Sequence, residues 1–312
     1  MPTTPPRLAI VTGAAGGLGR AFCRRIAQVA PCHIVAIDRD EPGAHEALRG
    51  LQRDAPQGGA LTAEVVAMDV TDATAWLELR RRLQQERPRL DLLVNNAGIC
   101  LAAEVGDGDL AAWRRVNEVN YVGVLAACHI MTPWLKASAR APSASGAASP
   151  SRQTSHGADS APAVINVASI AAFLAAPSMG AYAAAKAAVV ALTEAMHAEL
   201  RPAGVHVTAV CPGFFRTGLL AAGEFCTRRH RAQAEKLARG AKFTADDVVQ
   251  AALAASAQGR LYSMIGGRAR WGWRAKRLAP GALVRMIERS YWGTFRGHGK
   301  GGEDAASARA DA

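Results

Sequence analysis

Three residues near the middle of the chain have the types and spacing that proton transfer requires. Tyr182 and Lys186 lie four positions apart in an Ala-rich run that favours helix, so their side chains share one helix face. Bringing the pKa of a phenol from near 10 to about 7 requires roughly 4 kcal/mol, and a nearby ammonium is a suitable perturber. Ser169 follows the β-rich run 164–168, so we expect it at a strand's carboxyl end, where ligands bind. The set indicates acid–base chemistry on a hydroxyl or carbonyl group, although a Tyr-x-x-x-Lys pair alone is also common on exposed helix faces.

A Gly-rich segment near the N-terminus has the pattern of a dinucleotide site. The apolar run 7–11 predicts a buried strand, TGAAGGLG follows at 12–19, and a helical run begins at Arg20. Gly13, Gly17 and Gly19 would let the backbone approach a pyrophosphate at the helix N-terminus. Asp38 ends the next predicted strand, 33–38, where an acid accepts hydrogen bonds from ribose hydroxyls and repels a 2′-phosphate. The segment predicts NAD, with NADP as the alternative because Arg39 is adjacent; a ligand-free turn and a solvated acid are the simpler interpretations.

The remaining pattern alternates strands and helices. Predicted strands cover 64–70, which ends in Asp69 and Val70, then 90–98, 164–168, 205–210 and 260–267. A helix over 113–137 has Asn120 in its middle, and the propensity cost of that residue suggests a use. A charged helical segment, 218–240, is a lid candidate. The alternation predicts the α/β class, with a doubly wound, parallel, seven-stranded Rossmann-type sheet and helices on both faces.

The composition of the chain indicates a globular protein with a large core and no membrane-spanning segment. The chain has 312 residues, half of them apolar, which allows a large core. Six cysteines show no CxxC pairing and no metal spacing, as expected for buried thiols of a cytoplasmic protein without a metal site. The uncharged run 161–185 is long enough to span a membrane, but its polar residues and Pro177 favour a strand, a loop and a helix.

Two segments stand apart in composition. Residues 138–162 are rich in Ser, Ala and Pro, so we predict a disordered surface insertion that contributes little packing. Residues 268–312 form a basic, Trp-rich extension after a domain of residues 1–267, and 260–300 alone supply +9 of the net charge of +11. A helix over 281–292 would present Leu283, Ile287 and Tyr291 on one face. The extension could cover the substrate pocket or a neighbouring subunit, bind a membrane surface, or remain a solvated tail; no nucleic-acid module accompanies it.

Taken in order, TGAAGGLG, NNAG at 95–98, Asn120, Ser169, Tyr182-x-x-x-Lys186 and the PG pair at 212–213 resemble the short-chain dehydrogenase/reductase family over about residues 7–267. The resemblance implies one Rossmann-type domain with strand order 3-2-1-4-5-6-7, an NAD(P) cofactor and a homodimer or homotetramer. The insertion and the extension depart from the family pattern, which weakens any inference about the substrate.

The resemblance also implies roles for individual residues. Tyr182 would be the general acid or base, Lys186 would lower its pKa and bind the nicotinamide ribose, Ser169 would orient the reacting oxygen, and Asn120 would hold a relay water. The implied cofactor site comprises Thr12, Gly13, Gly17, Leu18, Gly19, Asp38, Asp69, Val70, Asn96, Ala97, Gly98, Tyr182, Lys186, Pro212, Gly213 and Thr217.

The leading hypothesis is an NAD(P)-dependent oxidoreductase that interconverts a secondary alcohol and a ketone, with an apolar or lipid-like substrate. We expect it in the cytoplasm, with peripheral membrane contact through 268–312 as one option. The alternative is a Rossmann-fold binding or regulatory protein that has lost catalysis. The complete Ser169, Tyr182, Lys186 and Asn120 set argues against that alternative.

Overall fold

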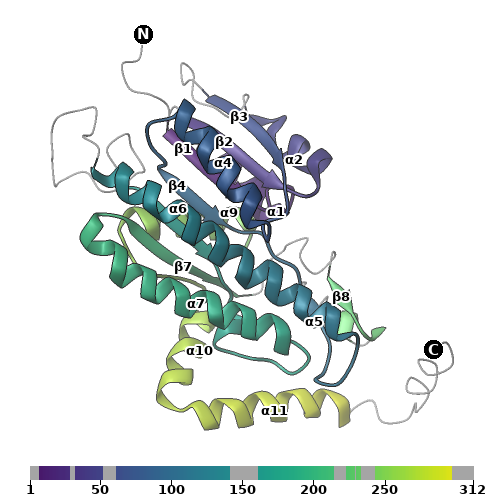
Figure 1. The fold of residues 1–312 in the computed structure, drawn as a ribbon. Helices are drawn as coiled ribbons and strands as arrows, with labels where there is room; N and C mark the ends of the chain where they lie inside the picture. Colours follow the sequence, from purple (N-terminus) through teal and green to yellow (C-terminus); the bar gives the residue numbers. More distant parts are fainter. Residues whose placement is uncertain are drawn as a thin grey trace.

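A parallel sheet of seven strands forms the centre of the molecule (Figure 1). The computed structural model describes residues 7–28, 32–51, 61–140, 161–213, 223–228, 230–232 and 243–296, without the side chains of 268 and 292–296. The strand order β3-β2-β1-β4-β6-β7-β9 matches the predicted 3-2-1-4-5-6-7, and every pair is parallel. The strands are β1 (Arg7–Thr12), β2 (Cys32–Asp38), β3 (Leu61–Ala67), β4 (Leu92–Asn95), β6 (Ala163–Val167), β7 (His206–Pro212) and β9 (Tyr262–Ile265).

The chain builds this sheet outward from its centre in both directions. It passes from β1 to β2 and β3, then returns to place β4 on the other side of β1. The connections after β1 and β4 therefore diverge at a topological switch point, which is where open α/β sheets bind ligands. The Gly-rich segment follows β1 and the NNAG segment follows β4, so the two motifs meet at this point.

Helices cover both faces of the sheet, as predicted. In β1, Leu8 and Ile10 enter the core beneath α4, α6 and α7, whereas Ala9 and Val11 enter the core beneath α1 and α9, as the two-residue period of a strand requires. The α-helices are α1 (Gly17–Ala27), α2 (Glu41–Leu48), α4 (Ala73–Glu86), α5 (Leu110–Asn117), α6 (Gly123–Arg140), α7 (Gly180–Leu200), α9 (Ala245–Ala257), α10 (Gly267–Leu278) and α11 (Pro280–Arg296).

Several helices begin at side-chain caps that the sequence supplies. Asp72 accepts hydrogen bonds from the backbone N–H groups of Thr74 and Ala75 and starts α4. Thr244 and Asp247 form a capping box at the start of α9. These caps satisfy backbone donors that a helix cannot pair internally.

The structure corrects several predicted bounds. Strand β3 ends at Ala67, so Asp69 and Val70 lie in the following turn and not in the strand. The helix predicted over 113–137 is α5 and α6 joined by a π-helical turn, η1 (Glu118–Val122). Helix α6 continues to Arg140 and so includes the first residues of the predicted insertion; residues 141–160 lie outside the described residues. A small parallel sheet of β5 (Leu101–Ala102) and β8 (Glu224–Phe225) was not expected, and most of the lid candidate 218–240 is also outside the described residues.

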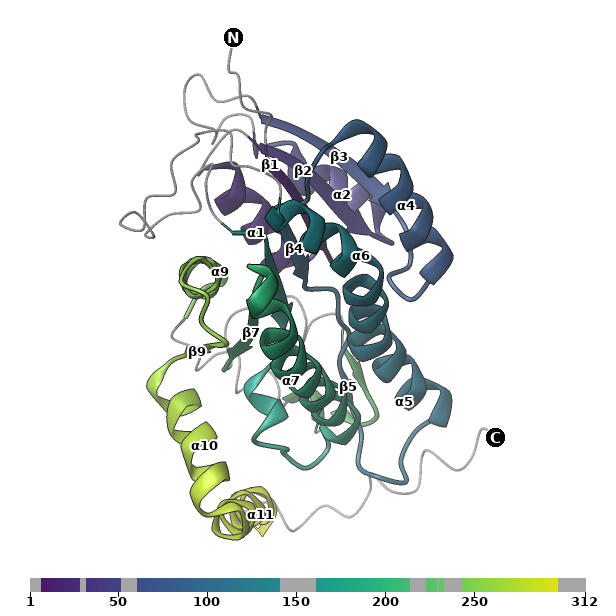
Figure 2. The same ribbon diagram turned by 60° about the vertical axis from the view of Figure 1, so that its left-hand side comes forward.

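Helices α10 and α11 extend from the carboxyl-terminal side of β9 and form an arm beside α7 (Figure 2). Leu283 and Tyr291 are buried and Ile287 is half-buried, which confirms the predicted stripe on one face of α11. Among the described residues, no helix is both long and apolar enough to cross a membrane.

Candidate active site

Helix α7 carries Tyr182 and Lys186 in its first two turns, next to the carboxyl end of β6. Both side chains are buried, with 8% and 3% of their surfaces exposed. The Lys186 Nζ donates a hydrogen bond of 2.8 Å to the carbonyl oxygen of Val167, the last residue of β6. It lies 5.8 Å from the centroid of the Tyr182 ring. The strand end therefore fixes the ammonium, and the helix fixes the phenol beside it.

Ser169 stands two residues after β6, as predicted. It caps the short 3-10 helix η2 (Ile170–Ala172), and its Oγ accepts a hydrogen bond of 3.1 Å from the Ala171 N–H. Its hydroxyl also faces the Tyr182 phenol, where it favours the charged form of the phenol. Because the backbone contact uses only an acceptor position, the Ser169 proton remains available for another oxygen.

Burial controls the electrostatics of this cluster. It lowers the pKa of Lys186 from 10.5 to about 8, because a buried ammonium loses its hydration. Burial also raises the pKa of Tyr182 above 10, and the nearby Cys100 thiol adds to the rise. The expected lowering of the phenol pKa by Lys186 is therefore not found in this structure. The Lys186 ammonium donates its hydrogen bond to Val167 and not to the phenol, and the desolvation of the phenol dominates the pKa of Tyr182.

Asn120 lies in the π-helical turn η1 and is fully buried. Its Oδ1 accepts a hydrogen bond from the Ile99 N–H at 2.8 Å, and its Nδ2 donates to the Ile99 carbonyl at 2.9 Å. A Cβ on Gly98 would lie 3.0 Å from this Oδ1 and 3.5 Å from the Lys186 Nζ. Asn120 and Lys186 thus both border Gly98, and a side chain there would crowd the Asn120 amide oxygen. A π turn inside a helix is frequent at functional sites.

The Gly-rich segment forms a tight turn in front of an uncapped helix. Gly13 has φ of +67°, and a Cβ there would lie 2.8 Å from the Ala97 Cα. A Cβ on Gly19 would lie 2.0 Å from the Gly13 carbonyl oxygen. The N-cap of α1, Gly16, provides no side-chain hydrogen bond, so the first backbone N–H groups of the helix remain available for an anion. Gly17 is exposed there, whereas the predicted contact Leu18 buries its side chain in the core and has only its backbone to offer.

The segment after β4 holds this turn in place. The Thr12 Oγ1 accepts hydrogen bonds from the N–H groups of Asn96 and Ala97 at 2.9 and 3.0 Å. The Asn96 Nδ2 donates to the carbonyl oxygens of Thr12 and Gly13, both at 3.0 Å. The two loops of the switch point therefore form one rigid unit.

Asp38, the last residue of β2, also holds the Gly-rich turn in place. Its Oδ2 accepts a hydrogen bond of 2.9 Å from the Ala15 N–H in the Gly-rich turn, and its Oδ1 accepts one from the Asp40 N–H. Arg39 lies 3.8 Å from Asp69, and both side chains are well exposed. Hydrogen bonds from Thr71 lower the pKa of Asp69. Asp38 still has lone pairs for a ribose hydroxyl, because each carboxylate oxygen accepts more than one hydrogen bond.

The remaining residues predicted at the cofactor site have no hydrogen bond to the Gly-rich turn among the described residues. Val70 is buried against Gly123, and its carbonyl accepts a hydrogen bond from the Trp76 indole. Pro212 ends β7, Gly213 follows it, and Thr217 lies outside the described residues.

Two cysteines near the cluster were not among the predicted site residues. The thiols of Cys100 and Cys211 are buried and close enough to Lys186 for their charges to interact. Burial raises the pKa of Cys100 to about 11 and that of Cys211 to about 12, so both remain neutral. Their positions in the sequence could have indicated them, because Cys100 lies just after the NNAG segment and Cys211 comes directly before the PG pair. Cys226, in contrast to the predicted buried thiols, is exposed.

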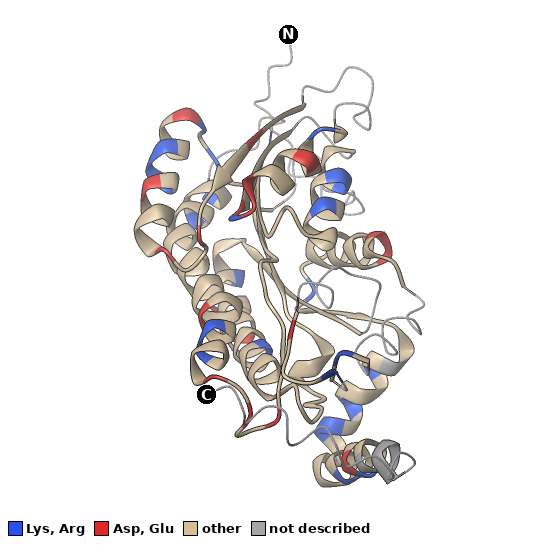
Figure 3. Cartoon of the chain, turned by 90° about the vertical axis from the view of Figure 1, so that its right-hand side faces the viewer, with Lys and Arg blue, Asp and Glu red and all other residues tan. Residues whose placement is uncertain are grey.

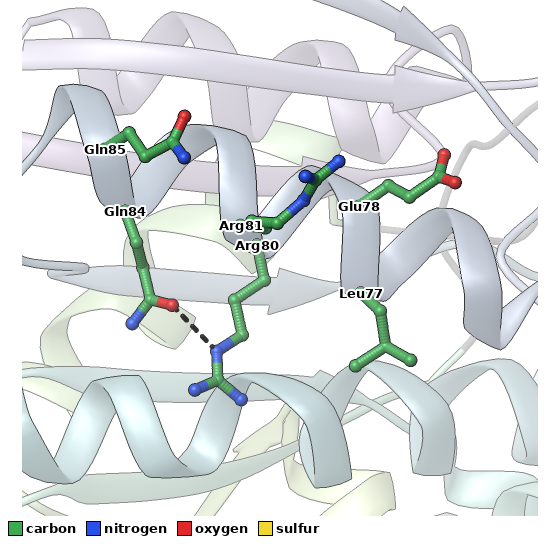
Figure 4. Close-up of a pocket in the computed structure, with 6 residues that line it drawn as sticks. All are labelled: Leu77, Glu78, Arg80, Arg81, Gln84 and Gln85. Carbon is green, nitrogen blue, oxygen red and sulfur yellow. Dashed lines mark hydrogen bonds between the residues drawn. The ribbon is translucent and has the colours of Figure 1, made fainter.

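A surface hollow on α4 is unrelated to this cluster (Figure 4). It is lined by Leu77, Glu78, Arg80, Arg81, Gln84 and Gln85. All of these residues belong to one helix, and Arg80 is held by Gln84 at 3.1 Å and by the Ile130 carbonyl at 3.0 Å. A hollow with one wall offers little burial to a ligand.

The fold and the cluster together define a dinucleotide-dependent oxidoreductase. A family model for short chain dehydrogenase matches residues 7–224. The chain therefore belongs to the short-chain dehydrogenase family and is an NAD(P)-dependent oxidoreductase.

Relatives and solved structures agree with this assignment. The chain is 36% identical to the cis-4-hydroxycyclohexanecarboxylate dehydrogenase of Sinomonas cyclohexanicum over 216 residues, which cover 69% of this chain and 76% of that protein. It is 30% identical to the cyclopentanol dehydrogenase of Comamonas testosteroni over 211 residues, 68% and 74% of the two chains. A crystal structure of a short chain dehydrogenase/reductase from Burkholderia phymatum in complex with NAD superposes with a TM-score of 0.72 at 25% identity, covering 89% of this chain and 95% of that one.

Proposed function

We propose that this protein interconverts a secondary alcohol and a ketone on an apolar carbon skeleton, with NAD preferred over NADP. The observation that carries the proposal is the cluster of the half-buried Ser169 with the buried Tyr182 and Lys186 at the carboxyl edge of the sheet, beside an uncapped Gly-rich turn. This arrangement supplies an oxygen-binding hydroxyl, a transferable proton and an anion site within one switch point.

The residues present fit a dinucleotide. The turn at Gly13 and Gly19 has no space for side chains, and the N-terminus of α1 could accept the pyrophosphate, with Asp38 at the adenosine ribose. The same residues argue for NAD, because the Asp38 charge would repel a 2′-phosphate. The bound cofactor would supply or accept the hydride, and the protein would supply orientation and the proton.

In this mechanism Ser169 donates a hydrogen bond to the reacting oxygen and holds it next to the Tyr182 hydroxyl. For ketone reduction, the Tyr182 proton passes to the oxygen that becomes the alcohol. Because burial raises the pKa of Tyr182, the phenol keeps that proton at neutral pH and is ready for this direction. For alcohol oxidation, Tyr182 must first lose its proton, and we assign Lys186 to the stabilisation of the phenolate. Asn120 positions the loop that separates it from Lys186.

Two observations support an apolar substrate. The segment 170–179, which follows Ser169 and leads into α7, contains no charged residue. The relatives named above carry cyclic secondary alcohols in their names, cyclopentanol and a hydroxycyclohexane. We therefore propose a secondary alcohol on an aliphatic ring as the first substrate class to test.

We also propose a homo-oligomer that assembles through α6 and α7. The outward face of α7 carries the exposed Ala184, Ala191 and Ala195, and α6 presents Leu125 with 37% of its surface exposed. Small side chains let two helices approach closely, so this face could pack against its own copy.

The test is the substitution Tyr182→Phe. It removes only the hydroxyl group that carries the transferable proton, so turnover of cyclopentanol and cyclopentanone should fall by at least about a hundredfold while NADH binding, followed by fluorescence, stays within a few-fold. Tyr121→Phe is the matched control, because no hydrogen bond of that hydroxyl is found among the described residues. Activity of Tyr182→Phe above a tenth of wild type would contradict the role. NADH binding by the wild type with no turnover across a broad alcohol panel would favour a binding protein.

A further inference from the structure

The turn between α10 and α11 is an exposed apolar elbow, which we define as residues 278–284. Leu278 has 85% of its surface exposed and Val284 has 53%, and Ala279, Pro280 and Ala282 between them are also exposed. Trp271 adds a large exposed ring on α10, at 56%. Figures 1 and 2 both place the elbow at the outer end of α10, away from the sheet. The chain thus presents contiguous apolar residues to the surroundings at the end of a projecting arm.

The inner side of the same arm is firmly attached, so the exposure of the elbow is not that of a loose tail. On α10, the Trp273 ring packs edge-on against Tyr262 of β9 with centroids 5.7 Å apart, and Arg277 lies 4.3 Å above the Trp273 ring. Tyr262 hydrogen-bonds Glu194 of α7. On α11, Leu283 and Tyr291 are buried, and Tyr291 hydrogen-bonds Glu104.

The outer side of the arm is cationic. Arg270 and Arg274 on α10 and Arg285 and Arg289 on α11 are exposed, and none of these four has an ion-pair partner among the described residues. Glu288 is the sole acid in the sequence from 260 to 300. Figure 3 shows blue segments along both helices. The arginines therefore flank the apolar elbow on both of its sides.

This combination selects one kind of partner. A second copy of the arm would bring two strongly positive segments together, which opposes self-association. Nucleic acid would bind the arginines through its phosphates, but Leu278 and Val284 cannot stack on bases and would gain nothing there. An anionic bilayer uses both features, because its phosphates pair with arginine and its interface accepts aliphatic side chains and tryptophan.

We propose that the arm docks on anionic phospholipid membranes, with the elbow in the interface and the four arginines on lipid phosphates. The docking would bring the carboxyl edge of the sheet, where Ser169 and Tyr182 lie, toward the lipid surface, because the arm also contacts the loops at that edge. Leu174, which follows η2, packs on α10 at Gly272, and Glu104 binds α11. The docking surface does not depend on the proposed catalytic function.

The experiment measures binding of the full chain to vesicles in the absence of substrate and cofactor. We expect flotation with vesicles of phosphatidylcholine and phosphatidylglycerol, weakening as salt is raised, and little flotation with phosphatidylcholine alone. The double variant Leu278→Asp/Val284→Asp should weaken binding at least about tenfold, because it places two charges in the interface, and Arg274→Glu/Arg285→Glu should do the same, because it removes two cations that would pair with lipid phosphates. Leu77→Asp is the control for new negative charge outside the arm: it places one acid, against two in the elbow variant, on an exposed apolar residue of α4 and should leave binding unchanged.

Three results would overturn the proposal. One is the absence of vesicle binding at low salt. Another is vesicle binding that the elbow variant leaves unchanged while the arginine variant abolishes it, because charge alone would then explain it. The third is binding to short duplex DNA or to an acidic polypeptide at lower concentration than to anionic vesicles. Folding of each variant is checked by NADH fluorescence, since all five substituted side chains are exposed and outside the cofactor site.

Discussion

Asp38 is the residue that most directly determines cofactor choice, and the structure gives it two roles. Its charge opposes a 2′-phosphate, and its Oδ2 also holds the Gly-rich turn through the Ala15 N–H. Asp38→Ala removes both, so it should shift the NAD-to-NADP ratio of kcat/KM by about tenfold or more, equal to 1.4 kcal/mol, while raising KM for both cofactors. Asp38→Asn keeps a hydrogen-bond acceptor without the charge. It should therefore shift the NAD-to-NADP ratio with a smaller rise in KM for both cofactors. A wild type that already prefers NADP tenfold would show that Arg39 determines the choice.

At this scale the motifs predicted which residues meet but not their electrostatics. Tyr182, Lys186 and Ser169 are brought together because helix spacing and a strand end are local features that the sequence displays. The neutralising effect of burial on Lys186 and Tyr182 depends on the surrounding packed layers, which no short pattern contains. Cys100 and Cys211 were missed for the same reason, since they come from strands and loops far apart in the chain.

At the scale of elements, α10 is a support for the catalytic loop as well as part of the arm. Trp273 packs on Tyr262, and Tyr262 packs edge-on against Phe173 with centroids 6.5 Å apart, four residues from Ser169. Trp273→Ala should loosen this contact, lowering the free energy of unfolding by about 2 kcal/mol and kcat by a few-fold, with NADH affinity unchanged. Trp271→Ala removes an exposed tryptophan from the same helix. In aqueous assays it should change neither the free energy of unfolding nor kcat. A fall in NADH affinity equal to the fall in kcat would indicate general unfolding and would contradict the positioning role.

Element existence was easier to predict than element ends. The seven strands and their order followed from buried apolar runs between helical patterns and from the family resemblance, and all are present. The end of β3 at Ala67 was missed because the apolar Met68 and Val70 on either side of Asp69 continue the alternation of a strand while the chain already turns toward the cap Asp72. The π turn at Asn120 has no distinct sequence signal, because it depends on how α5 and α6 pack. The small sheet of β5 and β8 pairs segments distant in sequence, which local patterns do not reveal.

At the scale of the whole molecule, the sequence separates a nearly neutral body from a basic arm, and the structure gives that separation a geometry. The body buries five of its six thiols and its catalytic lysine, whereas the arm exposes Arg270, Arg274, Arg285 and Arg289. The pH response of folding therefore belongs to the body, and the response to salt and lipid belongs to the arm.

The pH response of folding can be predicted from the buried thiols. Burial raises the pKa of Cys23, Cys128 and Cys211 to about 12 and that of Cys32 and Cys100 to about 11, from 9.0. Above pH 9 the unfolded chain releases thiol protons that the folded chain keeps, so the unfolding free energy should fall by up to about 1.4 kcal/mol per thiol per pH unit. Lys186 acts in the opposite sense, since its folded pKa of about 8 lies below 10.5 and favours folding as pH rises between these values. Five thiols outweigh one amine, so stability should decrease from pH 9 to 10.5.

Urea unfolding at pH 8, 9 and 10 under reducing conditions measures this slope. Cys23→Ala should lower stability at every pH because it leaves a small cavity, yet it should make the decline above pH 9 shallower, because one of the five shifted thiols is gone. Cys226→Ala removes an exposed thiol and should change the slope least. Equal or greater stability at pH 10 than at pH 8 would mean that the Lys186 contribution dominates, and that the thiols are better solvated than their burial in the core indicates.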